Sequence, residues 1–222
     1  ESVRFGDATE VTFPSTDSEE FQVNTYIQGH QEQPSMAGLT DGGYVVTWES
    51  PSQDGSGEGV FAQRDGASGE PRGDEFQVNT WTGNEQNNAN VTGLENGGFF
   101  ITWQDSSGSN NQIGGGESWD VRGQLYNASG VAQGPEVLIN TQTYNEQTAP
   151  EVTALADGGY VVTWHSRYQD TGSSDYGIYG QRYDANGTPS GSEFRVNTWT
   201  SSSSLGSKTK YCGTDCSECF KG

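Results

Sequence analysis

Acidic side chains follow three tryptophans in this sequence, and their spacing suggests ligands for a metal ion. The segments 49–59, 104–120 and 165–177 are rich in Asp, Ser and Gly. Ca²⁺ prefers carboxylate, hydroxyl and backbone carbonyl oxygens on a flexible loop. No complete EF-hand spacing is present, so calcium binding and a merely solvated polar loop both stay open. The candidate calcium ligands are Asp54, Glu58, Asp105, Asp120, Asp170 and Asp175.

A second set of candidates follows the repeated Asn-Thr pair, where an aromatic residue often comes next. Tyr26, Trp81 and Trp199 occupy this place, with Gln142 at the matching position and Tyr144 close by. An exposed ring can stack on the apolar face of a sugar while neighbouring Asn and Gln side chains bind its hydroxyls. These positions predict a glycan-binding surface, and the alternative is that the rings pack beneath an adjacent unit.

Residues typical of hydrolytic or nucleophilic catalysis form no motif in this chain. His30 and His165 are isolated, and neither an HExxH nor a GxSxG sequence accompanies them. A pair of carboxylates can hydrolyse glycosides, but nothing singles out one pair among the 30 acidic residues. The sequence therefore predicts a protein without enzymatic activity.

Two groups of residues are candidates for covalent modification. Asn90, Asn127 and Asn186 each begin an Asn-X-Ser/Thr triplet, which accepts a glycan in a eukaryotic secretory pathway. Three cysteines at C-x3-C-x2-C spacing are one thiol short of a closed structural zinc site. They predict either a cross-link to another chain or one local disulfide with a free thiol. These cysteines are Cys212, Cys216 and Cys219.

The charge of the chain excludes some partners. Ten basic and 30 acidic residues give a formal net charge of -20, which repels a phosphate backbone and argues against nucleic-acid binding. No apolar run is long enough to span a membrane. The first residues lack a signal-peptide pattern, so we expect that an exported form has already lost its signal.

The elements that would position these residues are repeated along the chain. The sequence EFQVNT and its variants begin at Glu20, Glu75, Glu136 and Glu193, at intervals of 55, 61 and 57 residues. The sequence pattern of each unit predicts four short strands separated by turns. The Asp-Gly-Gly sequence is typical of a tight hairpin. In the first unit the predicted strands are 20–25, 34–39, 44–48 and 59–64.

The third strand of each unit is apolar on both faces, which indicates how the units pack. In the first unit Tyr44 and Trp48 lie on one face, and Val45 lies on the other. A strand of this kind must be covered on both sides, so we expect sheets that stack in a row or ring. The sequence predicts an all-β, propeller-like or β-prism-like fold of three tandem four-stranded repeats, in which the tryptophans belong to the core.

The termini of the chain are offset within the repeat. Such an offset is found where strands from both termini complete one propeller blade, and also in a piece of a longer array. The predicted organisation is a partial preceding repeat or closing strand (1–19), repeat 1 (20–74), repeat 2 (75–135), repeat 3 (136–192), the first strand of a fourth repeat (193–200) and a Ser-rich linker with a Cys-rich tail (201–222).

The motifs GGYVVTW, QRYDANG and EFRVNT occur in this order in residues 158–198. Their combination resembles the tandem repeats of very large secreted bacterial and cyanobacterial proteins of the calcium-associated, adhesin-like kind. The resemblance covers about residues 20–200, and it implies an extracellular location with an adhesive or matrix role. The glycosylation triplets and the Cys-rich end also fit a eukaryotic extracellular relative.

Together these observations predict a secreted, non-enzymatic module for adhesion or assembly that depends on Ca²⁺. Its expected partners are other copies of itself, or extracellular glycans and proteins. The alternative prediction is a glycan-binding lectin, and a glycoside hydrolase is the third.

Overall fold

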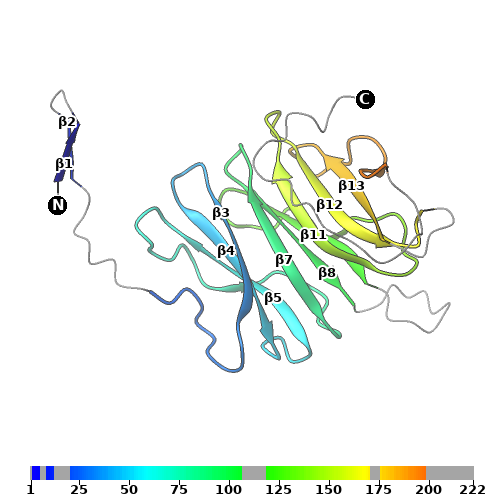
Figure 1. Ribbon diagram of the computed structural model, residues 1–222. Coiled ribbons are helices and arrows are strands. Elements are labelled where there is room, and N and C mark those ends of the chain that lie inside the picture. Colours follow the sequence, from blue (N-terminus) through cyan, green and yellow to red (C-terminus); the bar gives the residue numbers. More distant parts are fainter. Residues whose placement is uncertain (1, 6–8, 13–20, 107–118, 171–175, 199–222) are drawn as a thin grey trace.

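The computed structural model describes residues 2–5, 9–12, 21–106, 119–170 and 176–198 (Figure 1). Within these ranges the protein is all-β, with three four-stranded antiparallel sheets, as predicted. Sheet 1 contains β3 (Glu32–Gly38), β4 (Tyr44–Pro51), β5 (Glu58–Asp65) and β6 (Phe76–Gln77). Sheet 2 contains β7 (Gln86–Gly93), β8 (Phe99–Asp105), β9 (Asp120–Tyr126) and β10 (Val137–Leu138). Sheet 3 contains β11 (Gln147–Ala154), β12 (Tyr160–Arg167), β13 (Tyr176–Tyr183) and β14 (Phe194–Arg195).

The three sheets lie face to face, like neighbouring blades of a propeller (Figure 1). In each sheet the strands follow one another in chain order, and the first strands β3, β7 and β11 are adjacent across the row. Sheets 1 and 3 both pack on sheet 2, and the row does not close on itself. The propeller-like prediction is therefore confirmed, as an open arc of sheets instead of a ring.

The core consists of two apolar layers, one on each face of sheet 2. Phe99, Ile101 and Trp103 belong to the layer shared with sheet 1. Phe100 belongs to the layer shared with sheet 3, where Trp164 also lies. All five side chains are at most 1% exposed, so the two-sided burial predicted for the third strand of the unit is confirmed.

The second glycine of each hairpin is required by close backbone packing. A Cβ atom on Gly43 would lie 2.4 Å from the carbonyl oxygen of Asp65, and one on Gly98 would lie 2.3 Å from that of Tyr126. No side chain fits at such distances. The turn is also fixed by Asp41, whose Oδ1 accepts a hydrogen bond from the N–H of Gly43 (3.0 Å).

The strand that we placed first in each unit is the last strand of the preceding sheet. Phe76 and Gln77 pair with β5, opposite Ala62 and Phe61. The reason is the Asn of the Asn-Thr pair: the Oδ1 atom of Asn79 accepts the backbone N–H of Val60 in β5 (2.8 Å) and holds the segment there. The sequence period was predicted, but each sheet starts one strand later than the predicted unit.

The two ends of the described chain follow the same rule. Residues 21–25 repeat this sequence and form no strand. Phe194–Arg195 pairs with β13, so it completes sheet 3 and does not open a fourth repeat. The strands β1 (Ser2–Phe5) and β2 (Thr9–Thr12) pair with each other, not as a closing strand of these three sheets. Among the described residues, no helix is long and apolar enough to cross a membrane.

Candidate functional site

The candidate residues that the structure describes lie at or next to one edge of the row of sheets. The N–H of Ser106, just after β8, donates to the carbonyl oxygen of Glu85 in the crossover from β6 to β7 (2.9 Å). The N–H of Arg167, at the end of β12, donates to the carbonyl oxygen of Glu146 in the crossover from β10 to β11 (2.9 Å). The loops after the tryptophans therefore meet the crossovers. We call this region the loop edge; it comprises residues 26–31, 52–57, 78–85, 139–146 and 168–170.

The crossover from β6 to β7 is built around a buried Asn–Gln pair. The Nδ2 atom of Asn79 donates to the carbonyl oxygen of Trp81 (2.8 Å) and to Oε1 of Gln86 (3.0 Å). Gln86 in turn donates to the carbonyl oxygen of Gly83 (2.7 Å). Asn79 is 3% exposed and Gln86 is fully buried, so these amides shape the loop and do not face a ligand. The expectation that they bind sugar hydroxyls is wrong at this crossover.

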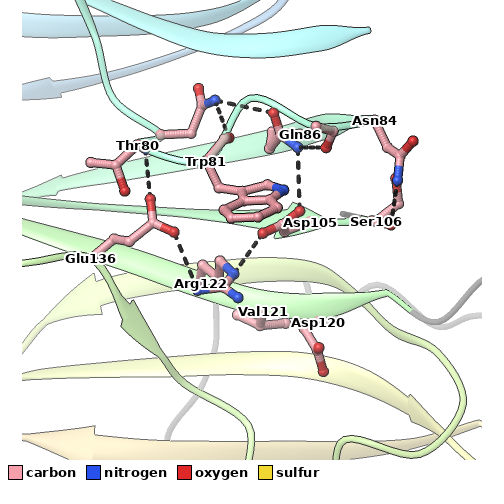
Figure 2. A network of polar contacts seen from close by, with 12 residues as sticks. Thr80, Trp81, Asn84, Gln86, Asp105, Ser106, Asp120, Val121, Arg122 and Glu136 are labelled. Carbon is pink, nitrogen blue, oxygen red and sulfur yellow. Dashed lines mark hydrogen bonds and ion pairs between the residues drawn. The ribbon is translucent and has the colours of Figure 1, made fainter. Parts of the chain in front are cut away.

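Trp81 projects from the first of these crossovers. Its side chain is 57% exposed, although its carbonyl oxygen is held by Asn79. The indole lies against Gly83, where a Cβ atom would come within 2.8 Å of Nε1. Figure 2 shows the ring next to Asp105 and above Arg122. The loop therefore presents a large ring to solvent from a backbone position that hydrogen bonds fix, as a sugar-stacking residue requires.

The other predicted stacking residues differ in exposure. Tyr144, in the next crossover, is 54% exposed, whereas Tyr26 is half-buried. Trp199 lies outside the described residues. The crossovers thus carry exposed rings at Trp81 and Tyr144, and Trp199 stays a prediction.

A buried ionic network lies beneath Trp81 (Figure 2). The Nε atom of Arg122 is 2.6 Å from Oδ2 of Asp105, and its Nη1 atom is 3.2 Å from Oε1 of Glu136. The Oε2 atom of Glu136 accepts the N–H of Thr80, next to Trp81 (2.7 Å). Asp105 is only 2% exposed. This predicted calcium ligand is therefore ion-paired with Arg122. Through Glu136 and Thr80, the network joins the crossover to the strands of sheet 2.

Three other predicted calcium ligands lie at equivalent positions in the three sheets, near the start of β5, β9 and β13. They are Asp54, Asp120 and Asp170. A Cβ atom on Gly59 would lie 2.8 Å from Oδ2 of Asp54, and one on Gly177 would lie 3.0 Å from Oδ2 of Asp170. In sheet 2 the position of these glycines is taken by Asp120, which brings its own carboxylate. The three carboxylates are equivalent to one another, one in each sheet, and they do not form one site.

The partners of these carboxylates differ from sheet to sheet. Asp54 Oδ1 accepts the N–H of Ser56 (3.0 Å), and Asp170 Oδ1 accepts the hydroxyl of Tyr179 (2.5 Å). Burial raises the pKa of Asp120, although the Nδ2 atom of Asn140 donates to it (2.8 Å) and opposes the shift.

The structure does not test the calcium prediction. Glu58 accepts a hydrogen bond from Asn87 (2.7 Å), and Asp175 lies outside the described residues. The part of the chain that the structure describes brings no three His, Cys, Asp or Glu side chains together as a metal site. Calcium binding therefore stays a prediction.

An aromatic and charged cluster that we did not predict lies at the loop edge of sheet 3. Tyr168 and Tyr176 are 45% and 49% exposed, and the guanidinium carbon of Arg167 lies 4.9 Å and 5.8 Å from their ring centroids. Arg167 is also paired with Glu146 (2.8 Å), which accepts the hydroxyl of Tyr176. This hydrogen bond, together with burial, raises the pKa of Tyr176. In the sequence, the only indication of this cluster is the Arg-Tyr pair at residues 167–168, next to the acidic loop.

The candidate glycosylation sites lie in different surroundings. The amide of Asn90 is used between sheets 2 and 3, where it donates to Glu151 (2.8 Å) and accepts the N–H of Val152 (3.1 Å). Asn127 accepts two backbone N–H groups of its own turn, and Asn186 is exposed. A glycan on Asn90 would break the contact between the sheets. Cys212, Cys216 and Cys219 lie outside the described residues.

No protein-family model and no curated protein matches this chain. Among solved structures, it is similar to an alpha-L-arabinofuranosidase from Lactobacillus brevis, with a TM-score of 0.49 and 14% identity over 73% of this chain and 52% of that one. It is also similar to an endo-arabinase from Bacteroides thetaiotaomicron VPI-5482, with a TM-score of 0.40 and 15% identity over 65% of this chain and 54% of that one. The chain spans about half the length of these two structures.

These comparisons correct one prediction. Both similar structures carry the names of enzymes, which contradicts the expectation of a non-enzymatic protein, and we withdraw that expectation. With TM-scores below 0.5 and identities of 14% and 15%, the likeness assigns no substrate and no catalytic residue to this chain.

Proposed function

We propose that the protein binds carbohydrate at the loop edge. The observation that carries this proposal is Trp81, a 57% exposed ring on a loop that is fixed from beneath by buried hydrogen bonds and ion pairs. A loop that is already ordered loses little conformational freedom when a ligand stacks on its ring, so more of the stacking energy appears as affinity. Tyr144, Tyr168 and Tyr176 add further exposed rings at the same edge.

Charged groups beside the rings supply the polar half of such a site. Arg167 and Glu146 lie next to Tyr168 and Tyr176, where a guanidinium can donate to a sugar hydroxyl and a carboxylate can accept from one. The net charge of -20 disfavours acidic sugars. We therefore expect neutral glycans as ligands. A secreted location and a role in adhesion remain predictions from the repeat resemblance.

Binding of the full chain to an array of neutral glycans tests this proposal. The expected result is a set of related glycans that bind the wild type and bind Trp81→Ala about tenfold more weakly. The control is Val131→Ala, because Val131 is 58% exposed in the turn at the other end of β9. The proposal is wrong if no neutral glycan binds, or if Trp81→Ala binds as the wild type does.

The same glycans also test for cleavage. Release of reducing ends is measured in parallel, with arabinan in the panel because the name endo-arabinase designates it as a substrate. Turnover would extend the proposal from binding to hydrolysis, and binding without turnover would leave the binding proposal as it stands.

A further inference from the structure

The two interfaces between the sheets are built in the same way. Glu49, on sheet 1, accepts the backbone N–H of Asn88 on sheet 2 through Oε1. At the matching position of the next interface, Gln104 on sheet 2 accepts the N–H of Ala149 on sheet 3 through Oε1 (2.9 Å). Asn88 and Ala149 both lie at a β-bulge with a φ of 52°. We call the side of a sheet that carries the acceptor its back face, and the opposite side its front face.

A second pair of hydrogen bonds repeats in each interface. Ser35 accepts the N–H of Val91 (3.3 Å), and Asn90 accepts the N–H of Val152 (3.1 Å). The valine side chains lie in the apolar layers, where they are 6% and 9% exposed. The back face of one sheet therefore fits the front face of the next through the same donors, acceptors and apolar residues.

The front face of sheet 1 shows this surface without a sheet against it. Met36 matches the buried valines in position, yet it is 65% exposed. Gln33 lies at the same β-bulge with a φ of 52°. A groove of about 700 Å³ lies between this face and the segment 21–24, lined by Phe21 of the segment and by Val46 and Trp48 of the sheet. An apolar side chain as exposed as Met36, at a position that is buried in both other sheets, indicates a surface that a partner can cover.

The back face of sheet 3 shows the complementary surface. Val196 is 50% exposed, whereas Val78 and Ile139, at the matching positions of sheets 1 and 2, are each 2% exposed. His165 stands at the position of the two buried acceptors and is exposed. A neutral imidazole nitrogen can accept the same hydrogen bond. Both end faces are therefore one half of an interface that the protein already forms twice.

We propose that the front face of sheet 1 packs on the back face of sheet 3 of a second copy of this chain. In that contact His165 accepts the N–H of Gln33 of the other copy, and Met36 packs near Val196. The contact is heterologous, so two copies can satisfy both ends by closing a ring. The ring contains three sheets from each chain, and a total of six falls within the usual four to eight blades of a propeller.

The segment 21–25 must leave its place when the second copy binds. Its Thr25 donates through Oγ1 to Glu75 (2.9 Å), as the N–H of Thr80 donates to Glu136 one sheet further on (2.7 Å). It therefore occupies the position of the last strand of a preceding sheet. Residues 194–198 of the second copy carry almost the same sequence, FRVNT in place of FQVNT, so the exchange conserves these contacts.

The mass of the full chain in solution tests the proposal. Analytical ultracentrifugation at physiological salt, which screens repulsion between two acidic copies, should show a particle of about twice 23.9 kDa. Met36→Asp and Val196→Asp each place a charge in the proposed contact, so each should weaken association at least about tenfold. Val131→Asp is the control, because it adds the same charge to a side chain that is equally exposed elsewhere. Circular dichroism of each variant confirms that it is folded.

A mixture of the two variants distinguishes this contact from other modes of association. Met36→Asp keeps an intact back face, and Val196→Asp keeps an intact front face, so the mixture should form a two-chain particle that neither variant forms alone. A wild type that is monomeric, or that grows into a polymer, overturns the proposal. So does a mixture of folded variants that remains monomeric, or a Val131→Asp variant that dissociates as they do.

Discussion

Glu49 links the packing of the sheets to pH. Its carboxyl group is 5% exposed between sheets 1 and 2, and burial raises its pKa from 4.5 to about 7. The N–H of Asn88 opposes this shift, whereas the nearby carboxylates of Glu58 and Glu32 add to it. The folded protein therefore keeps this proton to a higher pH than the unfolded chain does.

Replacing Glu49 with Gln removes this pH dependence. In the wild type the contribution of Glu49 to the free energy of unfolding is full below about pH 4.5 and falls by up to about 3 kcal/mol by pH 7. Gln104 makes the same hydrogen bond in the next interface, so Glu49→Gln keeps the contact and should be more stable than the wild type at pH 8. Urea unfolding at pH 5 and pH 8 measures both effects. An equal difference in stability between the two proteins at both pH values contradicts this account.

At the level of single residues, the sequence predicted where a side chain lies better than it predicted which residues that side chain contacts. Trp81 was chosen for its place after Asn-Thr, and it is exposed as a stacking residue must be. The role of Asp120 was missed, because it lies in β9 and replaces a carboxylate that the other sheets take from a loop. The cluster of Tyr168 and Tyr176 was missed because Glu146, which holds it, comes from a crossover more than 20 residues away.

The hairpins are the elements in which sequence and structure agree most directly. The glycine pair in each hairpin was predicted as a turn. Its second glycine also allows the hairpin to pack closely against the next strand of the sheet, which is β5 in sheet 1. Gly43 faces the carbonyl oxygen of Asp65 so closely that any Cβ atom must move the backbone.

Gly43→Ala should lower the free energy of unfolding by about 2 kcal/mol or more. Gly38→Ala in β3 is the matched control, because a Cβ atom there has nothing within 4 Å. Thermal or urea unfolding of both variants measures the difference. Equal stability of the two variants would show that the close approach to Asp65 does not constrain the hairpin.

The sequence did not predict which strand begins each sheet. A repeat gives the length of a unit, but the same period is compatible with any starting strand. The pairing of Phe76 and Gln77 with β5, and the hydrogen bond from Val60 to Asn79, show that the Asn-Thr segment belongs to the preceding sheet. The Asn side chain is a local indication that the segment pairs with the preceding sheet, although Asn is equally typical of a turn.

For the whole molecule, the sequence predicted stacked four-stranded sheets from the two-sided apolarity of the Tyr-Val-Val-Thr-Trp strands, and this is what the structure shows. Whether the row closes depends on the faces of sheets 1 and 3. Residues such as Met36 and Val196 resemble core residues in the sequence, and only their exposure identifies them as ends of the row.

Calcium binding is tested at this scale, because the carboxylates that the structure describes are distributed over all three sheets. A native protein that binds Ca²⁺ should unfold several degrees higher in Ca²⁺ than in a chelator, since 100 times the Kd adds about 2.7 kcal/mol. A thermal melt of the full chain under the two conditions measures this difference. Identical midpoints would contradict the calcium prediction that the repeat resemblance implies.

In the proposed function, the loop edge binds carbohydrate through Trp81. Calorimetric titration of the strongest neutral glycan from the array into wild type and Trp81→Ala tests it most directly. We predict binding by the wild type, an affinity about tenfold lower for Trp81→Ala, and no change for Val131→Ala. Equal affinities of the wild type and a folded Trp81→Ala variant would contradict the claim.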